Sequence, residues 1–140
     1  MHASLLVADD ANPEDLQFLE DQVNEYNFAT AGIHDARLLV ILLRDSSGRI
    51  CAGLSGHTWG GVGEVRFLWV DEPKRRSGIG QPPPPCSRRG VVARGCSKIV
   101  LSTHSFQAPH FYLKQGYIIT GVFADYPRGH RSIFLEKALR

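Results

Sequence analysis

Residues 64–80 read EVRFLWVDEPKRRSGIG and join a strand pattern to a basic loop that contains two glycines. Glu64–Val70 alternates as a β-strand does, and Lys74–Arg76 then precede Gly78 and Gly80. A glycine loop between a strand and a helix lets backbone N–H groups converge on an anion, and the helix N-terminus adds partial positive charge. The stretch therefore predicts a phosphate or diphosphate site at the end of a strand.

This loop lacks the two best-known phosphate-binding motifs. A P-loop requires Gly-Lys-Ser/Thr, which does not follow the glycines. A dinucleotide fingerprint requires Gly-x-Gly-x-x-Gly after an early strand, and this loop follows a late one. A Gly-x-Gly loop with basic neighbours is also a common solvated turn, so the loop alone leaves the function open.

Alternating and helical patterns place the other elements around this loop. The N-cap Asn12 with Pro13 at the first helical position predicts a helix that ends near residues 30–32. A second helix is expected at Ala108–Gln115, before Gly116. The expected strands are Ser4–Ala8, Arg37–Arg44, Arg49–Trp59, Glu64–Val70, Lys98–Thr103, Tyr117–Phe123 and Ser132–Leu135. This order predicts an α/β domain built on a mixed sheet.

Length and charge narrow the class of protein. A chain of 140 residues with 43% hydrophobic residues predicts a single globular domain over residues 1–140. A net charge of +2 is too small to indicate nucleic acid or an anionic membrane as a partner. No signal peptide is recognised, and no apolar run approaches the ~20 residues of a membrane span, so a cytoplasmic protein is expected. The three cysteines match neither a zinc site nor a redox motif, so no metal is expected.

Two blocks of sequence resemble the GNAT superfamily of N-acetyltransferases. Arg75, Gly78 and Gly80 meet the family pattern Arg/Gln-x-x-Gly-x-Gly/Ala. Downstream, residues 108–117 read APHFYLKQGY and resemble the family block A-x-x-F-Y-x-K-x-G-F/Y. Two blocks in register are much more specific than either one.

The tail extends this resemblance. Residues 125–130 read DYPRGH, which is similar to the D-Y-P-x-G-H sequence of a bacterial subgroup of the family, and the likeness runs from about Leu5 to Leu139. The resemblance implies a mixed, mostly antiparallel sheet of six to seven strands. Its two central parallel strands, Glu64–Val70 and Lys98–Thr103, splay apart to hold acetyl-CoA.

The resemblance also implies cofactor contacts and an activity. The backbone of Leu68 and Val70 is expected to bind the pantetheine arm, and Ser105 stands where many members have Asn. The expected pyrophosphate loop comprises Arg75, Arg76, Ser77, Gly78, Ile79, Gly80 and Gln81. The implied enzyme is an acetyl-CoA-dependent N-acyltransferase that acetylates a primary amine of a small molecule or peptide. Homodimers are common among members of the family.

The chemistry requires a neutral amine and a proton for the departing thiolate. Tyr112 stands where the family often has its general acid, although it also fits as a helix residue packed beside Phe111. Glu64 is the preferred general base, acting through water, although a carboxylate at a strand end is often only solvated. His104 and Asp125 are the alternative bases.

Two further residues lie in the turn before the last expected strand. Tyr126 and His130 are candidates either to contact the acceptor or to hold the turn in place. Nothing in the sequence separates the two roles.

Residues 82–90 read PPPPCSRRG where the family has a long amphipathic helix. Prolines in a helix interior cost about 3 kcal/mol each, and four in a row favour polyproline II. Codons that encode PPPPCSRRG can, read one base later, encode RLLRAAAEG, which is amphipathic and helix-forming. We therefore favour a pair of compensating frame errors over a proline-rich ligand motif, and a helical backbone through 82–90 would support that explanation.

Two other functions remain open at this stage. One is a non-catalytic acyl-CoA-binding or regulatory module on the same fold, which the altered helix favours weakly. The other is an interaction domain that uses the proline run.

Overall fold

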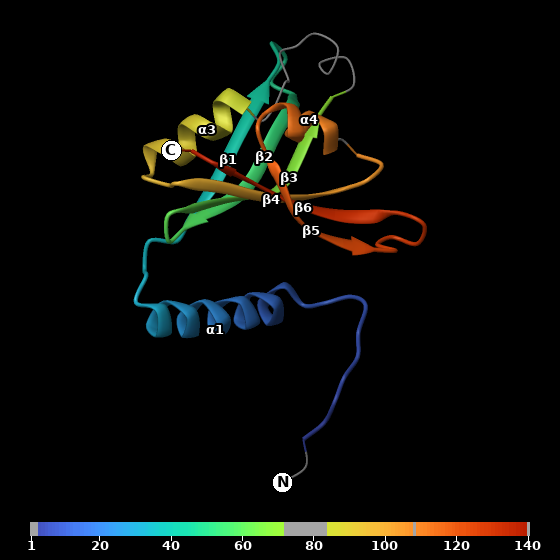
Figure 1. The fold of residues 1–140 in the computed structure, drawn as a ribbon. Helices are drawn as coiled ribbons and strands as arrows, with labels where there is room; N and C mark the ends of the chain where they lie inside the picture. Colours follow the sequence, from blue (N-terminus) through green and yellow to red (C-terminus); the bar gives the residue numbers. More distant parts are fainter. Residues whose placement is uncertain (1–2, 72–83, 108, 140) are drawn as a thin grey trace. The chain divides into compact units, whose positions relative to one another are not determined.

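The computed structural model describes residues 3–71, 84–107 and 109–139 (Figure 1). The chain divides into two compact units, residues 1–34 and residues 35–140. None of the helices in the described ranges is long and apolar enough to cross a membrane.

The first unit contains the helix α1 (Pro13–Ala31). The side chain of Asn12 accepts a hydrogen bond from the backbone of Glu14 at 2.9 Å, and Gly32 ends the helix in the left-handed conformation. Both predicted helix ends are thus confirmed. The strand expected at Ser4–Ala8 was wrong, because this segment has no regular secondary structure. A strand depends on a partner for its backbone hydrogen bonds, which a short apolar run cannot supply.

The second unit is built on one six-stranded sheet in the order β1-β2-β3-β4-β6-β5. Its strands are β1 (Arg37–Arg44), β2 (Ile50–Trp59), β3 (Val62–Val70), β4 (Lys98–His104), β5 (Ile118–Ala124) and β6 (Arg131–Ala138). β3 and β4 pair in parallel, and the other neighbouring strands pair antiparallel. The predicted mixed, mostly antiparallel α/β sheet is therefore confirmed.

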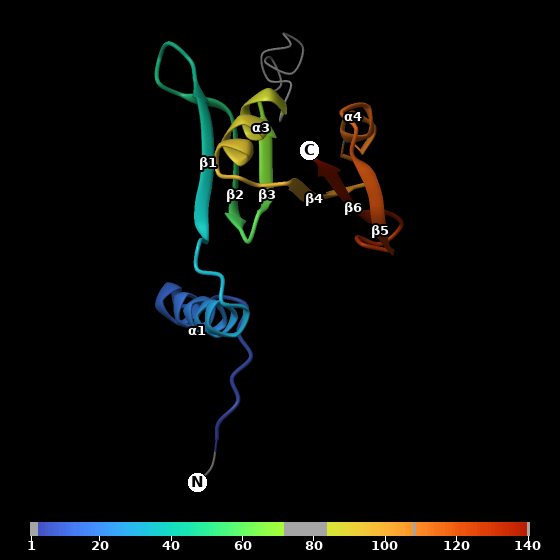
Figure 2. The same ribbon diagram turned by 60° about the vertical axis from the view of Figure 1, so that its left-hand side comes forward.

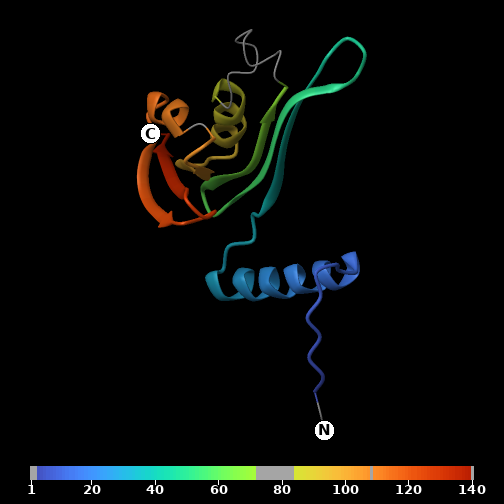
Figure 3. The ribbon, with the colours of Figure 1, turned by 90° about the vertical axis from the view of Figure 1, so that its right-hand side faces the viewer.

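Two helices lie on one side of this sheet, α3 (Pro84–Ala93) and α4 (Pro109–Lys114). Figure 3 shows the sheet curving around them. Val91 of α3 is fully buried, and a Cβ on Gly63 of β3 would lie 2.8 Å from both of its methyl carbons. The core on this side includes Val65, Leu101 and Leu135. Glycine at position 63 thus lets α3 lie close against β3.

A two-residue turn joins β2 to β3. Gly60 and Gly61 both have positive φ, 60° and 83°, which suits glycine in a tight hairpin. β3 therefore begins at Val62, two residues before the predicted start at Glu64. This short turn fixes which residues of β2 face which residues of β3.

Candidate active site

The central parallel strands separate partway along their length. β3 and β4 pair over four positions, from Val62 opposite Lys98 to Val65 opposite Leu101. Both strands continue past the last pair, β3 to Val70 and β4 to His104. Figures 1 and 2 show the two ribbons running in different directions. The predicted splaying of these strands is confirmed.

A β-bulge accompanies the separation. On the β2 side, Ser55 faces Phe67 and Gly56 faces Val65, so Arg66 is an extra residue in β3. A bulge bends the strand that contains it and increases its twist. A Cβ on Gly56 would overlap the carbonyl oxygen of Glu64, so only glycine fits opposite the bulge. The bulge lies immediately after the last β3–β4 pair, where bending turns β3 away from β4.

The residues expected to bind the pantetheine arm lie past this separation. Leu68 and Val70 follow the bulge and pair with Leu54 and Ala52 of β2 on the other side. Their position suits the predicted backbone contacts, which remain a prediction. The expected pyrophosphate loop, residues 75–81, lies outside the described residues.

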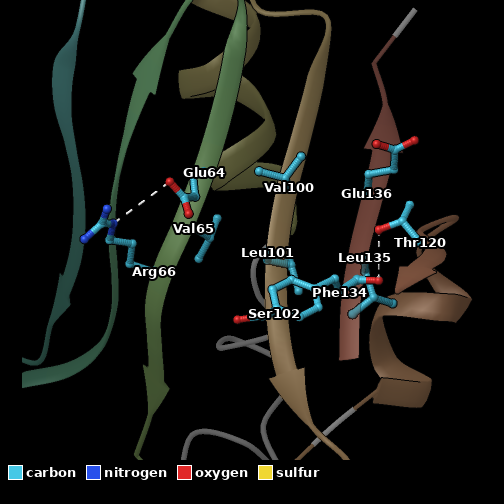
Figure 4. A pocket seen from close by; sticks show the side chains of 10 residues that line it. All are labelled: Glu64, Val65, Arg66, Val100, Leu101, Ser102, Thr120, Phe134, Leu135 and Glu136. Carbon is cyan, nitrogen blue, oxygen red and sulfur yellow. Dashed lines mark hydrogen bonds and ion pairs between the residues drawn. The ribbon is translucent and has the colours of Figure 1, made fainter. Parts of the chain in front are cut away.

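A cavity of about 370 Å³ opens beside the paired part of β3 and β4. Its wall includes two carboxylates and two hydroxyl groups, those of Glu64, Glu136, Ser102 and Thr120. Glu64 and Glu136 are each paired in register with Val100, so both carboxylates belong to one face of the sheet (Figure 4). The strands that carry them, β3 and β6, are two strand spacings apart, or about 10 Å. The cavity is large enough for a small polar molecule.

The Glu64 carboxylate lies within 4.0 Å of two basic side chains. Its Oε2 lies 3.1 Å from His57 Nε2 and 4.0 Å from Arg66 Nε. Only the first distance is that of a hydrogen bond. The Glu64 side chain is 41% exposed, so its carboxylate reaches solvent as well as the cavity. A partly exposed, hydrogen-bonded carboxylate is a suitable proton acceptor.

Tyr112 lies in the core, on the face of the sheet opposite the one that carries the Glu64 carboxylate. Its ring packs edge-on against Phe111 and Tyr117, at 5.5 Å in each case. Burial raises the pKa of Tyr112 to about 12, so its hydroxyl stays protonated at neutral pH. Tyr112 belongs to the core cluster with Val65, whereas Glu64 points to the other face because neighbouring strand residues alternate. The predicted acid and base thus belong to opposite faces beside the separation.

The remaining predicted residues gather at the end of β4. His104 Nδ1 lies 3.1 Å from the carbonyl oxygen of Tyr126, and its ring stacks on Phe106. His130 packs edge-on against Phe106. These contacts tie the β5–β6 turn to β4, which is the structural role considered for Tyr126 and His130.

Asp125 and Ser105 also make hydrogen bonds in and around the β5–β6 turn. Asp125 has a φ of 54°, and its carboxylate accepts a hydrogen bond from the Gly129 backbone at 3.2 Å. The Ser105 hydroxyl oxygen accepts a hydrogen bond from the Arg131 backbone at 3.0 Å, and its predicted cofactor contact stays a prediction. Neither His104 nor Asp125 is among the residues that line the cavity beside Glu64.

Sequence reasoning missed His57 and Arg66. Counting outward from a two-residue Gly60–Gly61 turn pairs Trp59 with Val62 and then His57 with Glu64. That count was the available signal, but the expected strands Arg49–Trp59 and Glu64–Val70 leave four residues between them instead of two. Nothing in the sequence marked the bulge at Arg66.

Comparison with known proteins identifies the family of the chain. The chain is 28% identical over 134 residues to an acetyltransferase of Agrobacterium fabrum, covering 96% of this chain and 98% of that one. It is 37% identical over 95 residues to a blasticidin-S acetyltransferase of Streptomyces morookaense, covering 66% of this chain and 68% of the relative. No protein-family model matches the chain.

Solved structures of acetyltransferases have the same fold. The fold matches a putative acetyltransferase from Agrobacterium tumefaciens with a TM-score of 0.87 and 28% identity, over 97% of this chain and 99% of that one. An acetyltransferase from Bacillus cereus matches with a TM-score of 0.77 and 29% identity, over 95% of this chain and 97% of that one. These relatives, together with the separated parallel strands, show that the chain belongs to the GNAT superfamily of acetyltransferases.

Proposed function

We propose that the chain is an N-acetyltransferase that moves the acetyl group of acetyl-CoA to a primary amine of a small molecule. The observation that carries this proposal is the separation of β3 from β4 after Val65 and Leu101. Strands that part in this way offer backbone groups to an extended ligand lying between them. An aminoglycoside 6'-N-acetyltransferase complexed with coenzyme A shares the fold, with a TM-score of 0.65 and 18% identity.

The described residues that suit acetyl-CoA come from both of the strands that separate. Leu68 follows the bulge on β3, and Ser105 follows β4, so they come from the two strands that separate. Acetyl-CoA, when bound, supplies the acetyl group as a reactive thioester. The residues of this chain then remove and deliver protons.

Glu64 and Tyr112 perform the two proton transfers in this proposal. The Glu64 carboxylate takes a proton from the ammonium group of the acceptor, directly or through water, which frees the nitrogen lone pair. The nitrogen bonds to the acetyl carbon as the carbon–sulfur bond breaks, and the new amide nitrogen releases its extra proton to water. Tyr112 gives its hydroxyl proton to the departing sulfur and regains one from solvent. A phenol with a raised pKa of about 12 is protonated at neutral pH, as a proton donor must be.

The cavity beside Glu64 is the proposed acceptor site. Its carboxylates and hydroxyls suit a polar amine, and its volume of about 370 Å³ suits a small molecule better than a folded protein. Two relatives are named for small acceptors, the blasticidin-S acetyltransferase and an IAA acetyltransferase of Azospirillum brasilense, which is 33% identical over 91 residues.

Turnover of acetyl-CoA with a panel of small primary amines tests this function. We expect Glu64→Gln to lower kcat by about 10² to 10⁴, the usual contribution of a general base. Tyr112→Phe is expected to lower kcat while leaving coenzyme A binding unchanged. Saturable coenzyme A binding with no turnover on any amine would instead favour a non-catalytic acyl-CoA-binding module.

A further inference from the structure

His57 is placed beside Glu64 by the backbone itself. The two residues are register partners on β2 and β3, three positions from the Gly60–Gly61 turn on either strand. Their side chains therefore share one face of the sheet, and the His57 Nε2 to Glu64 Oε2 distance is 3.1 Å. His57 is not among the residues that line the cavity, whereas Glu64 is.

We infer that His57 is a positioning residue that holds one oxygen of Glu64 so that the other faces the acceptor. This inference rests on the proposed role of Glu64 as the general base. A carboxylate only accepts hydrogen bonds, so the proton of a neutral His57 is assigned to Nε2. The hydrogen bond restricts the rotation of a side chain that is otherwise 41% exposed.

The other neighbours of Glu64 are less suited to this role. Arg66 Nε lies 4.0 Å away on a side chain that is 62% exposed. Lys98 pairs with Glu136 instead, at 3.4 Å. On the far side of His57, the register partner on β1 is the apolar Leu38. His57 is therefore the closest charged or polar contact described for the Glu64 carboxylate.

Steady-state kinetics of three variants tests the role of His57. We expect His57→Leu to lower kcat by about 10- to 100-fold, because a misplaced catalytic group costs that much. His57→Gln keeps an N–H donor and is expected to recover most of the loss. His110→Ala, on an exposed position of α4, is the matched control and should leave kcat unchanged. The KM for acetyl-CoA should remain within about 3-fold in all three.

A double variant separates positioning from a merely structural role. In a Glu64→Gln background, His57→Leu is expected to cause no further loss of kcat. An equal loss in both backgrounds, or no recovery with His57→Gln, would overturn the inference. Absence of wild-type turnover would overturn the proposed function, whereas wild-type turnover with an unimpaired His57→Leu variant would overturn the role of His57 alone.

Imidazole ¹⁵N NMR gives a readout that does not depend on turnover. We expect the Nε2 signal of His57 to move on Glu64→Gln and to stay unchanged on Glu136→Gln. If the Nε2 chemical shift does not change on Glu64→Gln, the hydrogen bond between His57 and Glu64 is absent and the inference is overturned.

Discussion

Gly56 illustrates how one residue positions the site. It faces the bulge at Arg66, and the carbonyl oxygen of Glu64 occupies the space that a side chain would need. The bulge in turn follows directly on the last pair between β3 and β4. The place where the strands part thus depends on a glycine that is not among the residues lining the cavity.

Replacing Gly56 tests this dependence. We expect Gly56→Ala to lower the free energy of unfolding by about 2 to 4 kcal/mol, because the backbone of β3 must move to admit the methyl group. Urea unfolding measures this change. Coenzyme A affinity should fall in the same variant.

Gly121 provides the matched control on β5. A Cβ there would meet no atom within 4 Å. Gly121→Ala is therefore expected to change stability by less than about 0.5 kcal/mol. Equal effects of the two substitutions would show that the close approach at Gly56 is unimportant.

At the scale of elements, α3 shows how the proline run is accommodated. The described helix begins at Pro84, which places Pro84 and Pro85 in its first turn. First-turn N–H groups have no partner within the helix, so proline loses no hydrogen bond there. A helical backbone from Pro84 to Gly90 agrees with the expectation for a frame error, whereas residues 82–83 lie outside the described range.

Exchanging this segment tests the frame-error explanation. We expect replacement of residues 82–89 by RLLRAAAE to raise the free energy of unfolding by about 1 to 3 kcal/mol, because leucine and alanine favour helix far more than proline and serine do. Thermal or urea unfolding measures the change. A loss of stability would indicate that the prolines belong to the native fold, and the nucleotide sequence of the gene gives an independent check.

The elements that could be predicted are those that depend on local chemistry. The cap at Asn12, the end at Gly32 and the strand Lys98–Thr103 needed only neighbouring residues. The start of β3 was misplaced because Gly63 was assigned to the turn, whereas glycine there admits Val91 of α3. The sequence predicted Glu64 as a site residue but not its partner His57, because that pair depends on strand register.

For the whole molecule, two buried phenols make stability sensitive to high pH. Burial raises the pKa of Tyr112 and of Tyr117 to about 12, above the ordinary value of 10. The unfolded chain then releases these protons at lower pH than the folded one. Their stabilising effect is complete below pH 10 and is lost as the pH rises from 10 towards 12.

Urea unfolding at pH 9 and at pH 11.5 measures this loss. We expect each tyrosine to contribute a fall of about 1.4 kcal/mol per pH unit within the window. Tyr112→Phe and Tyr117→Phe should each remove the part of this pH-dependent loss of stability that comes from the substituted tyrosine. A slope that is the same in the double variant and the wild type would show that neither phenol is responsible.

Hydrogen exchange with and without coenzyme A tests the central claim, that the cofactor binds where β3 and β4 separate. We expect saturable coenzyme A binding to slow amide exchange in residues 66–70 of β3 and in the peptide that contains Ser105. Exchange in β1, which is one of the two edge strands of the sheet, should not change. Protection confined to other strands, or an exchange pattern unaffected by saturating coenzyme A, would contradict the account.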